Sequence, residues 1–154
     1  MNKNFKIIIR AAIAVDAPAV ADCVNESFSK YIERIGKPPA PMLLDYPAFI
    51  NAGKVWIAEY QSKICGVLVI YETSDGFYLD TVAVNSAYQG FGVGRALLQF
   101  AEREALRRGF ASIYLCTNIK MTENQTFYPR IGYIEYDRRM EDGYDRIFYR
   151  RQLL

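Results

Sequence analysis

Hydrophobic positions along the chain recur with two different periods, and each period predicts one type of element. Apolar residues from Val20 to Ile35 recur at helical spacing, so we expect a first helix that Asp16 caps and Gly36 ends. Prolines at 38, 39 and 41 prevent its continuation. The other helices expected are Asp45–Ala52, Gly94–Arg108 and Asn124–Arg130.

Runs rich in β-branched and aromatic residues predict strands between these helices. The expected strands are Lys6–Ala12, Val55–Tyr60, Lys63–Tyr71, Phe77–Val84, Ala111–Thr117, Tyr133–Arg139 and Arg146–Leu153. Gln61 and Ser62 predict a tight hairpin. A helix joins strands 77–84 and 111–117, so we expect that pair to be parallel with a right-handed crossover. The order predicts an α/β (α+β) fold: a mixed, mostly antiparallel sheet of about seven strands with helices on both faces.

Composition and charge narrow the class of protein. With 154 residues, 51% hydrophobic and 23% charged, the chain has the size and balance of one soluble globular domain, 1–154. Its 19 basic and 17 acidic residues are too evenly matched to favour nucleic acid as a partner. The local basic group is interpreted as a solvated edge; it consists of Arg138, Arg139, Arg146, Arg150 and Arg151.

The sequence predicts no metal site, no membrane-spanning segment and no signal peptide. Three widely spaced cysteines and no histidine make a metal site unfavourable. Residues 1–10 have no signal-peptide pattern, and no apolar run reaches the roughly 18 residues of a membrane span. We therefore predict a cytoplasmic protein. Oligomeric state is left open, with a homodimer as one possibility.

A glycine-rich segment connects strand 77–84 to the helix that follows it. Unpaired N–H groups at a helix N-terminus attract an anion, and glycines let a phosphate approach closely. The Walker pattern fails because no lysine follows, and the dinucleotide pattern fails because the glycines are spaced two and two. The pattern that fits is Gln/Arg-x-x-Gly-x-Gly/Ala. The segment comprises Gln89, Gly90, Phe91, Gly92, Val93, Gly94, Arg95 and Ala96.

Two stretches resemble the GNAT superfamily of acetyl-CoA-dependent N-acetyltransferases. Residues 79–98 look like the family's central strand, pyrophosphate loop and helix, and residues 124–133 resemble its Asn…Phe-Tyr-x-x-x-Gly-Phe/Tyr segment. The resemblance covers nearly the whole chain. It implies that acetyl-CoA is the co-substrate and that the central strand splays from its parallel neighbour to admit the cofactor arm.

The resemblance also implies roles for individual residues. Amides from Phe91 to Ala96 would hold the pyrophosphate, and the backbones of Val82 and Val84 would pair with pantetheine. Asn124 would contact the arm. Tyr128 would lie near the sulfur and act as general acid, since a phenol with a pKa of about 10 is protonated at neutral pH. The alternative is that Tyr128, one of 12 tyrosines, only packs in the core.

The general base is a carboxylate, and four are candidates. Asp80 is the first choice because it precedes Val82 by two residues and should share its face of the strand. Glu26, Glu59 and Glu72 are the alternatives. An acyl-cysteine route through Cys116 is disfavoured, because the chain has no histidine to generate a thiolate.

The expected activity is acetyl transfer from acetyl-CoA to a primary amine of a small molecule or peptide, by direct attack and without a metal. A non-catalytic acyl-CoA sensor or regulatory domain is the rival, and a nucleotide-binding module is a weaker third. Some aromatic residues of the first half are candidates for a substrate pocket, with core packing as the alternative: Phe28, Tyr31, Tyr46, Phe49 and Trp56.

Overall fold

The computed structural model describes residues 5–154, so residues 1–4 of the stretch considered for a signal peptide lie outside the described part. Within residues 5–154, seven strands form one sheet in the order β1-β2-β3-β4-β5-β7-β6. The strands are β1 (Ile8–Ala11), β2 (Val55–Tyr60), β3 (Lys63–Thr73), β4 (Gly76–Val84), β5 (Ser112–Asn118), β6 (Ile134–Glu141) and β7 (Tyr144–Gln152). All neighbours are antiparallel except β4 and β5. The predicted mixed sheet is confirmed.

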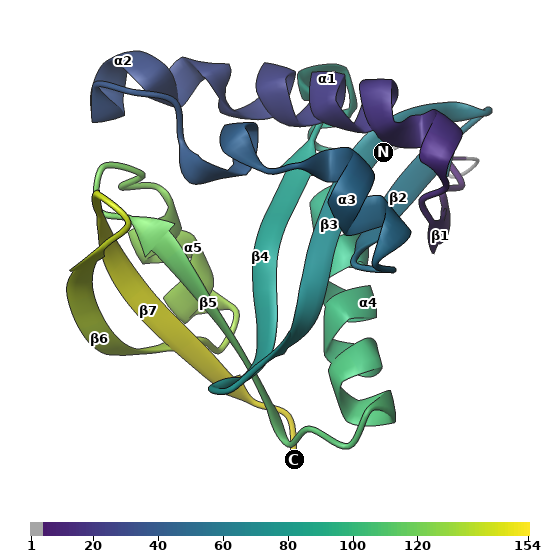
Figure 1. Ribbon diagram of the computed structural model, residues 1–154. Helices are drawn as coiled ribbons and strands as arrows, with labels where there is room; N and C mark the ends of the chain where they lie inside the picture. The colour runs from purple at the N-terminus through teal and green to yellow at the C-terminus, as the bar shows by residue number, and fades with distance from the viewer. Residues whose placement is uncertain (1–4) are drawn as a thin grey trace.

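Helices cover both faces of the sheet, as predicted (Figure 1). The α-helices are α1 (Ala17–Phe28), α2 (Ile32–Ile35), α3 (Tyr46–Asn51), α4 (Val93–Arg107) and α5 (Asn124–Arg130). Four 3-10 helices accompany them in the described residues: η1 (Ala14–Asp16), η2 (Ser29–Tyr31), η3 (Ala40–Leu43) and η4 (Ser86–Tyr88).

Two hydrophobic clusters fill the layers. The α4-side cluster contains Leu79, Leu97, Ala101, Ile113 and Tyr149 among its buried members. The α1-side cluster contains Val20, Val24, Ile57, Val67 and Ala83. In each cluster the apolar face of an amphipathic helix packs on alternate residues of the central strands. The apolar positions with helical spacing and those with the two-residue spacing of strands therefore meet in the same core.

The parallel pair at the centre of the sheet is short. Only Phe77, Tyr78 and Leu79 of β4 pair with β5, opposite Ile113, Tyr114 and Leu115. Beyond them β4 stays with β3 and β5 stays with β7, and the two strands diverge towards α1 and α2 (Figure 1). The parallel arrangement and the splay that the resemblance implied are both present.

A β-bulge lies at the point of divergence. Thr81 pairs with Val69 and Leu79 pairs with Ile70, which leaves Asp80 as the extra residue of β4. A bulge reverses the alternation of side chains along its strand. Leu79 therefore belongs to the α4-side cluster, whereas Ala83 belongs to the α1-side cluster.

The first helix differs from its prediction in two ways. It changes from α1 to η2 after Phe28 and resumes as α2, because a helical spacing of apolar residues does not distinguish an α-turn from a tighter 3-10 turn. Asp16 does not cap α1 with its side chain. Its carboxylate accepts hydrogen bonds from the Ile13 amide and from the Arg10 guanidinium, both at 2.8 Å.

The tight hairpin predicted at Gln61 and Ser62 is confirmed. Gln61 and Ser62 both have positive φ, 50° and 66°, as a two-residue hairpin turn requires. Asp142 and Gly143 form a second turn of this kind, with φ of 54° and 81°. Because that turn uses only two residues, β7 begins at Tyr144 rather than at the predicted Arg146.

Gly66 of β3 lies directly against side chains of α4. A Cβ there would lie 2.9 Å from side-chain atoms of Leu97 and Val93. We expect Gly66→Ala to lower the free energy of unfolding by about 1–3 kcal/mol through overpacking, measured by urea denaturation. Gly94→Ala is the matched control, since its Cβ would meet only Val84 at 3.5 Å. Equal stability of the Gly66→Ala variant and the unchanged protein would contradict this account.

Candidate active site

The glycine-rich segment leads into α4 as an open turn. Gly90 and Gly92 have φ of 86° and 84°, in the left-handed region that favours glycine. Gly92 is the N-cap of α4, and its carbonyl accepts the first helical bond, from the Ala96 amide, at 3.0 Å. The amides just before Ala96 therefore have no acceptor within the helix and are available to an anion.

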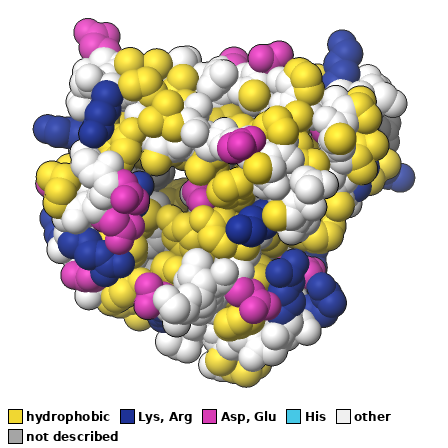
Figure 2. All heavy atoms as spheres, in the orientation of Figure 1, with side chains coloured by type: hydrophobic (Ala, Val, Ile, Leu, Met, Phe, Trp, Pro, Cys, Tyr) yellow, Lys and Arg dark blue, Asp and Glu magenta, His cyan; other side chains and the backbone are white. Residues whose placement is uncertain are grey.

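A cavity of about 780 Å³ extends from this turn, past the splay, to α5. Figure 2 shows a hollow on this face of the molecule, bordered by hydrophobic side chains and a few acidic ones. Its lining includes nine of the predicted cofactor-binding residues: Val82, Val84, Gln89, Gly90, Gly92, Val93, Gly94, Arg95 and Asn124. The structure thus brings together residues from three separate parts of the sequence.

Phe91 and Ala96, also predicted to bind the cofactor, are outside this lining. The Phe91 ring stacks on Phe5, with ring centroids 4.8 Å apart. Its side chain is therefore engaged outside the cavity. Of the candidate aromatic residues, Phe28 and Tyr31 line the cavity, whereas Tyr46 is buried in the α1-side cluster.

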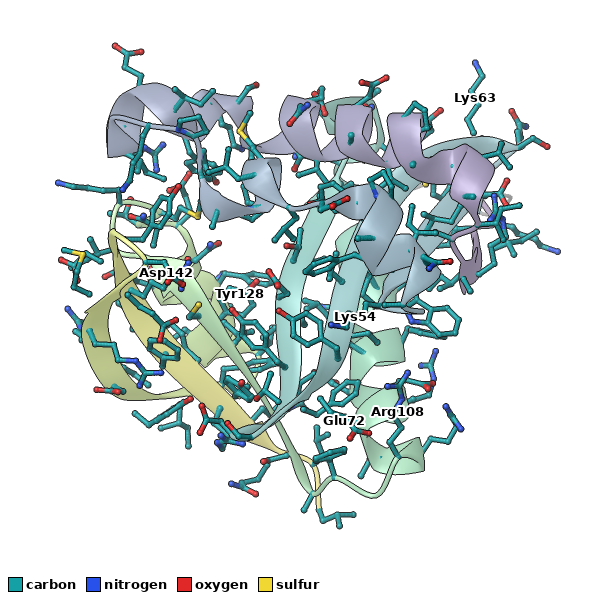
Figure 3. The ribbon with its side chains drawn as sticks, viewed as in Figure 1. Lys54, Lys63, Glu72, Arg108, Tyr128 and Asp142 are labelled. Carbon is teal, nitrogen blue, oxygen red and sulfur yellow. The ribbon has the colours of Figure 1, made fainter. Side chains whose placement is uncertain are left out.

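Tyr128 lies on α5 beside the opening between β4 and β5 (Figure 3). Its ring packs against those of Phe127, Tyr133 and Tyr149 at centroid distances of 5.2, 5.5 and 6.0 Å. The side chain is thus both a core residue and part of the cavity wall. Burial raises the pKa of the Tyr128 hydroxyl, so it is protonated at neutral pH.

Asn124 is fixed at the start of α5. Its side-chain amide donates to the Thr117 hydroxyl at 2.9 Å, near the end of β5. Gln125 donates to the Ile119 carbonyl at 2.9 Å. These two bonds attach α5 to the diverging end of β5 and hold Asn124 at the cavity.

Asp80 is the one of the four candidate bases that lines the cavity. The Tyr71 hydroxyl donates to its carboxylate at 2.6 Å, and the Thr81 hydroxyl donates at 3.2 Å. Burial raises the pKa of Asp80, partly offset by these two hydrogen bonds. A carboxylate with a raised pKa is a stronger proton acceptor than an exposed one.

The reason given for choosing Asp80 is nevertheless wrong. Val82 packs against the α4-side cluster, whereas Asp80 bonds to Tyr71, which packs against the α1-side cluster. The bulge at Asp80 places these two side chains on opposite faces, because it breaks the two-residue period on which the expectation depended.

The other three candidate carboxylates are outside the lining of this cavity. Glu26 accepts a hydrogen bond from the Ser86 amide at 3.1 Å. Glu59 forms an ion pair with Arg10 at 2.5 Å. Glu72 is exposed (Figure 3).

The cavity residues that the sequence did not predict as site residues include Tyr78, Tyr144 and Arg146. The prediction that Arg146 belongs to a solvated edge is wrong, since its side chain is only 13% exposed and forms an ion pair with Glu141 at 2.7 Å. Arg146 reaches the cavity because it pairs with Asn118 at the end of β5. No local pattern of residues signals that register.

Cys116 also lines the cavity, with its Sγ 3.1 Å from the Tyr78 hydroxyl. Burial raises the pKa of this thiol, which disfavours the thiolate that a nucleophilic cysteine requires. In the described part of the chain, no group of three or more His, Cys, Asp or Glu side chains is arranged to hold a metal ion. Nor is any helix of residues 5–154 both long and apolar enough to cross a membrane.

Comparison with known proteins gives one family and many related folds. A curated relative, probable N-acetyltransferase 14 of Xenopus tropicalis, is 33% identical over 87 residues, which cover 54% of this chain and 42% of the relative. The chain thus matches less than half of that relative's length. The PaiA N-acetyltransferase of Thermoplasma acidophilum, solved with coenzyme A, has a TM-score of 0.77 at 16% identity, covering 96% of this chain and 99% of its own.

A second solved structure is similar over an equally large part of the chain. The ribosomal-protein-S18-alanine N-acetyltransferase of Escherichia coli has a TM-score of 0.72 at 19% identity, covering 96% of this chain and 94% of its own. At such identities these two structures establish a shared fold. The Acetyltransferase (GNAT) family model matches residues 20–133, which is most of the sequence. The chain therefore belongs to the GNAT acetyltransferase family.

Proposed function

We propose that this protein transfers the acetyl group of acetyl-CoA to a primary amine of a small molecule or peptide. The observation that carries the proposal is the single cavity that joins the anion-binding turn, the splayed edge of β4, and the side chains of Asp80 and Tyr128. PaiA N-acetyltransferase, which shares the fold, was solved with coenzyme A. Both the binding of coenzyme A and the chemistry of acetyl transfer can be assigned to residues of that cavity.

The turn and the strand edge suit the two polar parts of coenzyme A. Backbone amides before Ala96 would hold the pyrophosphate, and nothing lies within 4 Å of a Cβ added at Gly90 or Gly92, so a phosphate has room there. From Asp80 to Val84, the edge of β4 that faces β5 has no strand partner among the described residues. Its backbone groups need hydrogen-bond partners, which the amides of pantetheine would provide.

Two side chains, those of Asp80 and Tyr128, carry out the proton transfers of the proposed reaction. Asp80 accepts a proton from the substrate ammonium, directly or through a water, and frees the lone pair of the amine. The amine attacks the thioester carbonyl, a C–N bond forms, and the C–S bond breaks. Tyr128 donates its proton to the leaving sulfur, and the extra proton on the attacking nitrogen passes through water to the resulting phenolate, so that an N-acetyl amide, the thiol of coenzyme A and a protonated Asp80 remain. An N–H of β4 near Val82 would stabilise the oxyanion.

The rival reading is an acyl-CoA sensor without turnover. It predicts coenzyme A binding with no release of thiol from acetyl-CoA in the presence of any amine. Following thiol release from acetyl-CoA across polyamines, amino acids, aminoglycosides and peptides separates the two, since turnover with any of them favours the enzyme. Cytoplasmic location, a homodimeric state and independence from metals stay predictions.

Gly92 provides a test of the anion site. Valine at φ of 84° is strained by about 1–3 kcal/mol and places a side chain where the phosphate would lie. We expect Gly92→Val to weaken coenzyme A binding by at least about tenfold in isothermal titration. Gly109→Val is the matched control, because Gly109 has φ of 88°, equally open surroundings and a position at the far end of α4. An equal loss of affinity in both variants would mean that the turn is not the site.

Tyr128→Phe tests the general acid. The ring stays in its aromatic surroundings, so folding and coenzyme A affinity should be unchanged, while kcat falls by about 10²-fold or more. Tyr133→Phe is the control, since Tyr133 packs on Tyr128 but is not part of the cavity lining, and its hydroxyl donates to Glu102. Unchanged kcat in the Tyr128 variant would remove that hydroxyl from the mechanism.

The pH profile tests Asp80. If Asp80 is the base, kcat/KM falls as pH drops through its raised pKa, because the protonated carboxyl accepts no proton. The hydrogen bond from Tyr71 lowers that pKa, so Tyr71→Phe should move the acid limb of the profile to higher pH. Asp80→Asn should abolish the limb together with most of the activity. A limb that stays in place in Tyr71→Phe would show that another group titrates.

A further inference from the structure

A second cavity, of about 550 Å³, opens on the other side of Asp80. Its floor is formed by β3, β4, β5 and β7, and its walls by the segment around η3 and the β6–β7 hairpin. It shares Ala40, Tyr78, Asp80, Tyr144 and Arg146 with the first cavity. Its remaining lining consists of Leu43, Leu44, Tyr71, Thr73, Asp75, Tyr114, Arg139, Glu141, Asp142 and Phe148.

Aromatic rings cover the floor of this cavity. Tyr71 meets Tyr78 edge to face with centroids 5.6 Å apart, and Tyr78 stacks on Tyr114 at 4.8 Å. Phe148 continues the band on β7, and Leu43 and Leu44 form an apolar wall opposite. A flat apolar body would bury its surface on these rings.

The charges of the cavity favour a cation. Asp75, Asp80, Glu141 and Asp142 oppose only two guanidinium groups. Both guanidinium groups are already paired, Arg139 with Glu141 at 3.2 Å and Arg146 with Glu141 at 2.7 Å. Glu141 and Asp142 both pair with these guanidinium groups, whereas Asp75 and Asp80 form no ion pair among residues 5–154. Asp75 is exposed, but Asp80 is half-buried and accepts hydrogen bonds only from the hydroxyls of Tyr71 and Thr81. It is the deep negative group that an ammonium would pair with.

We propose that this second cavity binds the acceptor, and that the acceptor is an arylalkylamine, an aromatic ring joined to a primary amine by a short carbon chain. The ring lies on the tyrosine floor and the ammonium points to Asp80, where the two cavities meet. A carboxylate beside the amine would face the excess negative charge and is disfavoured. This inference rests on the proposed acetyl transfer and names its substrate class.

The test is a comparison of matched amines, with thiol release from acetyl-CoA as the readout. We expect kcat/KM for 2-phenylethylamine to exceed that for hexylamine, which lacks the ring, by at least about tenfold. It should exceed that for phenylalanine, which adds a carboxylate, by about 100-fold. Spermidine and a short peptide with a free N-terminus should both be poorer acceptors than 2-phenylethylamine.

The outcomes separate this inference from the proposed function. Faster turnover of hexylamine, spermidine or the peptide would overturn the substrate class and leave acetyl transfer intact. No turnover of any amine by a protein that binds coenzyme A would overturn the proposed function itself. Binding of 2-phenylethylamine to the coenzyme A complex, measured by titration, should be tighter than that of hexylamine.

Two pairs of variants test whether the acceptor amine binds in this second cavity. Tyr78→Leu removes a ring of the floor and should reduce the preference for 2-phenylethylamine over hexylamine, whereas Tyr78→Phe keeps the ring and should retain it. Coenzyme A affinity reports whether each variant is folded. A preference that survives Tyr78→Leu would overturn the assignment of the ring to this floor.

The second pair of variants tests the negative charge where the β6–β7 hairpin borders the second cavity. Asp142 lines the cavity (Figure 3), and Asn also tolerates its φ of 54°. Asp142→Asn should raise KM for 2-phenylethylamine by about two- to fivefold at low salt with kcat unchanged. Asp145→Asn, on the same hairpin but outside the lining, should leave KM unchanged. Equal KM values in the two variants would contradict the role of the cavity's charge.

Discussion

The site depends on the separation of two parallel strands. Pairing of β4 with β5 ends after Leu79, yet neither strand lacks support, because β4 continues on β3 as far as Gly66 and β5 continues on β7 as far as Arg146. The two antiparallel ladders therefore stabilise both strands, while the facing edges of β4 and β5 have no strand partner beyond Leu79 and Leu115 among the described residues. Open backbone groups inside a protein require partners, and an extended, amide-bearing molecule such as the pantetheine proposed to lie in the gap would supply them.

The bulge at Asp80 determines what lies on each side of the gap. It turns Asp80 to the α1 side, with Tyr71 and the tyrosine floor, and leaves Val82 and Val84 packed on the α4 side, next to the glycine turn. With a regular strand, the carboxylate and the valines would share one face. One extra residue thus separates the half of the first cavity next to the glycine turn from the acidic, aromatic second cavity while keeping them in contact.

The sequence predicted features that depend on local pattern. The strands, the Gln61–Ser62 turn and the α5 segment follow from periodicity and turn chemistry. The features that were missed depend on register between distant segments. The bulge arises from how β4 pairs with β3, and the burial of Arg146 arises from its place opposite Asn118. No short stretch of sequence encodes either, which is why the base was chosen for the wrong reason.

Burial affects every proton that the proposed reaction moves. It raises the pKa of the carboxyl of Asp80, which strengthens it as a base, and it raises the pKa of the Tyr128 hydroxyl, which by itself weakens it as an acid. Cys116 shows what happens to a sulfur in the same cavity, since burial raises the pKa of its thiol as well. A leaving thiolate formed there is destabilised for the same reason and takes up a proton more readily. The low polarity that makes Tyr128 a weaker acid therefore also makes its partner a stronger base, so proton donation remains feasible at neutral pH.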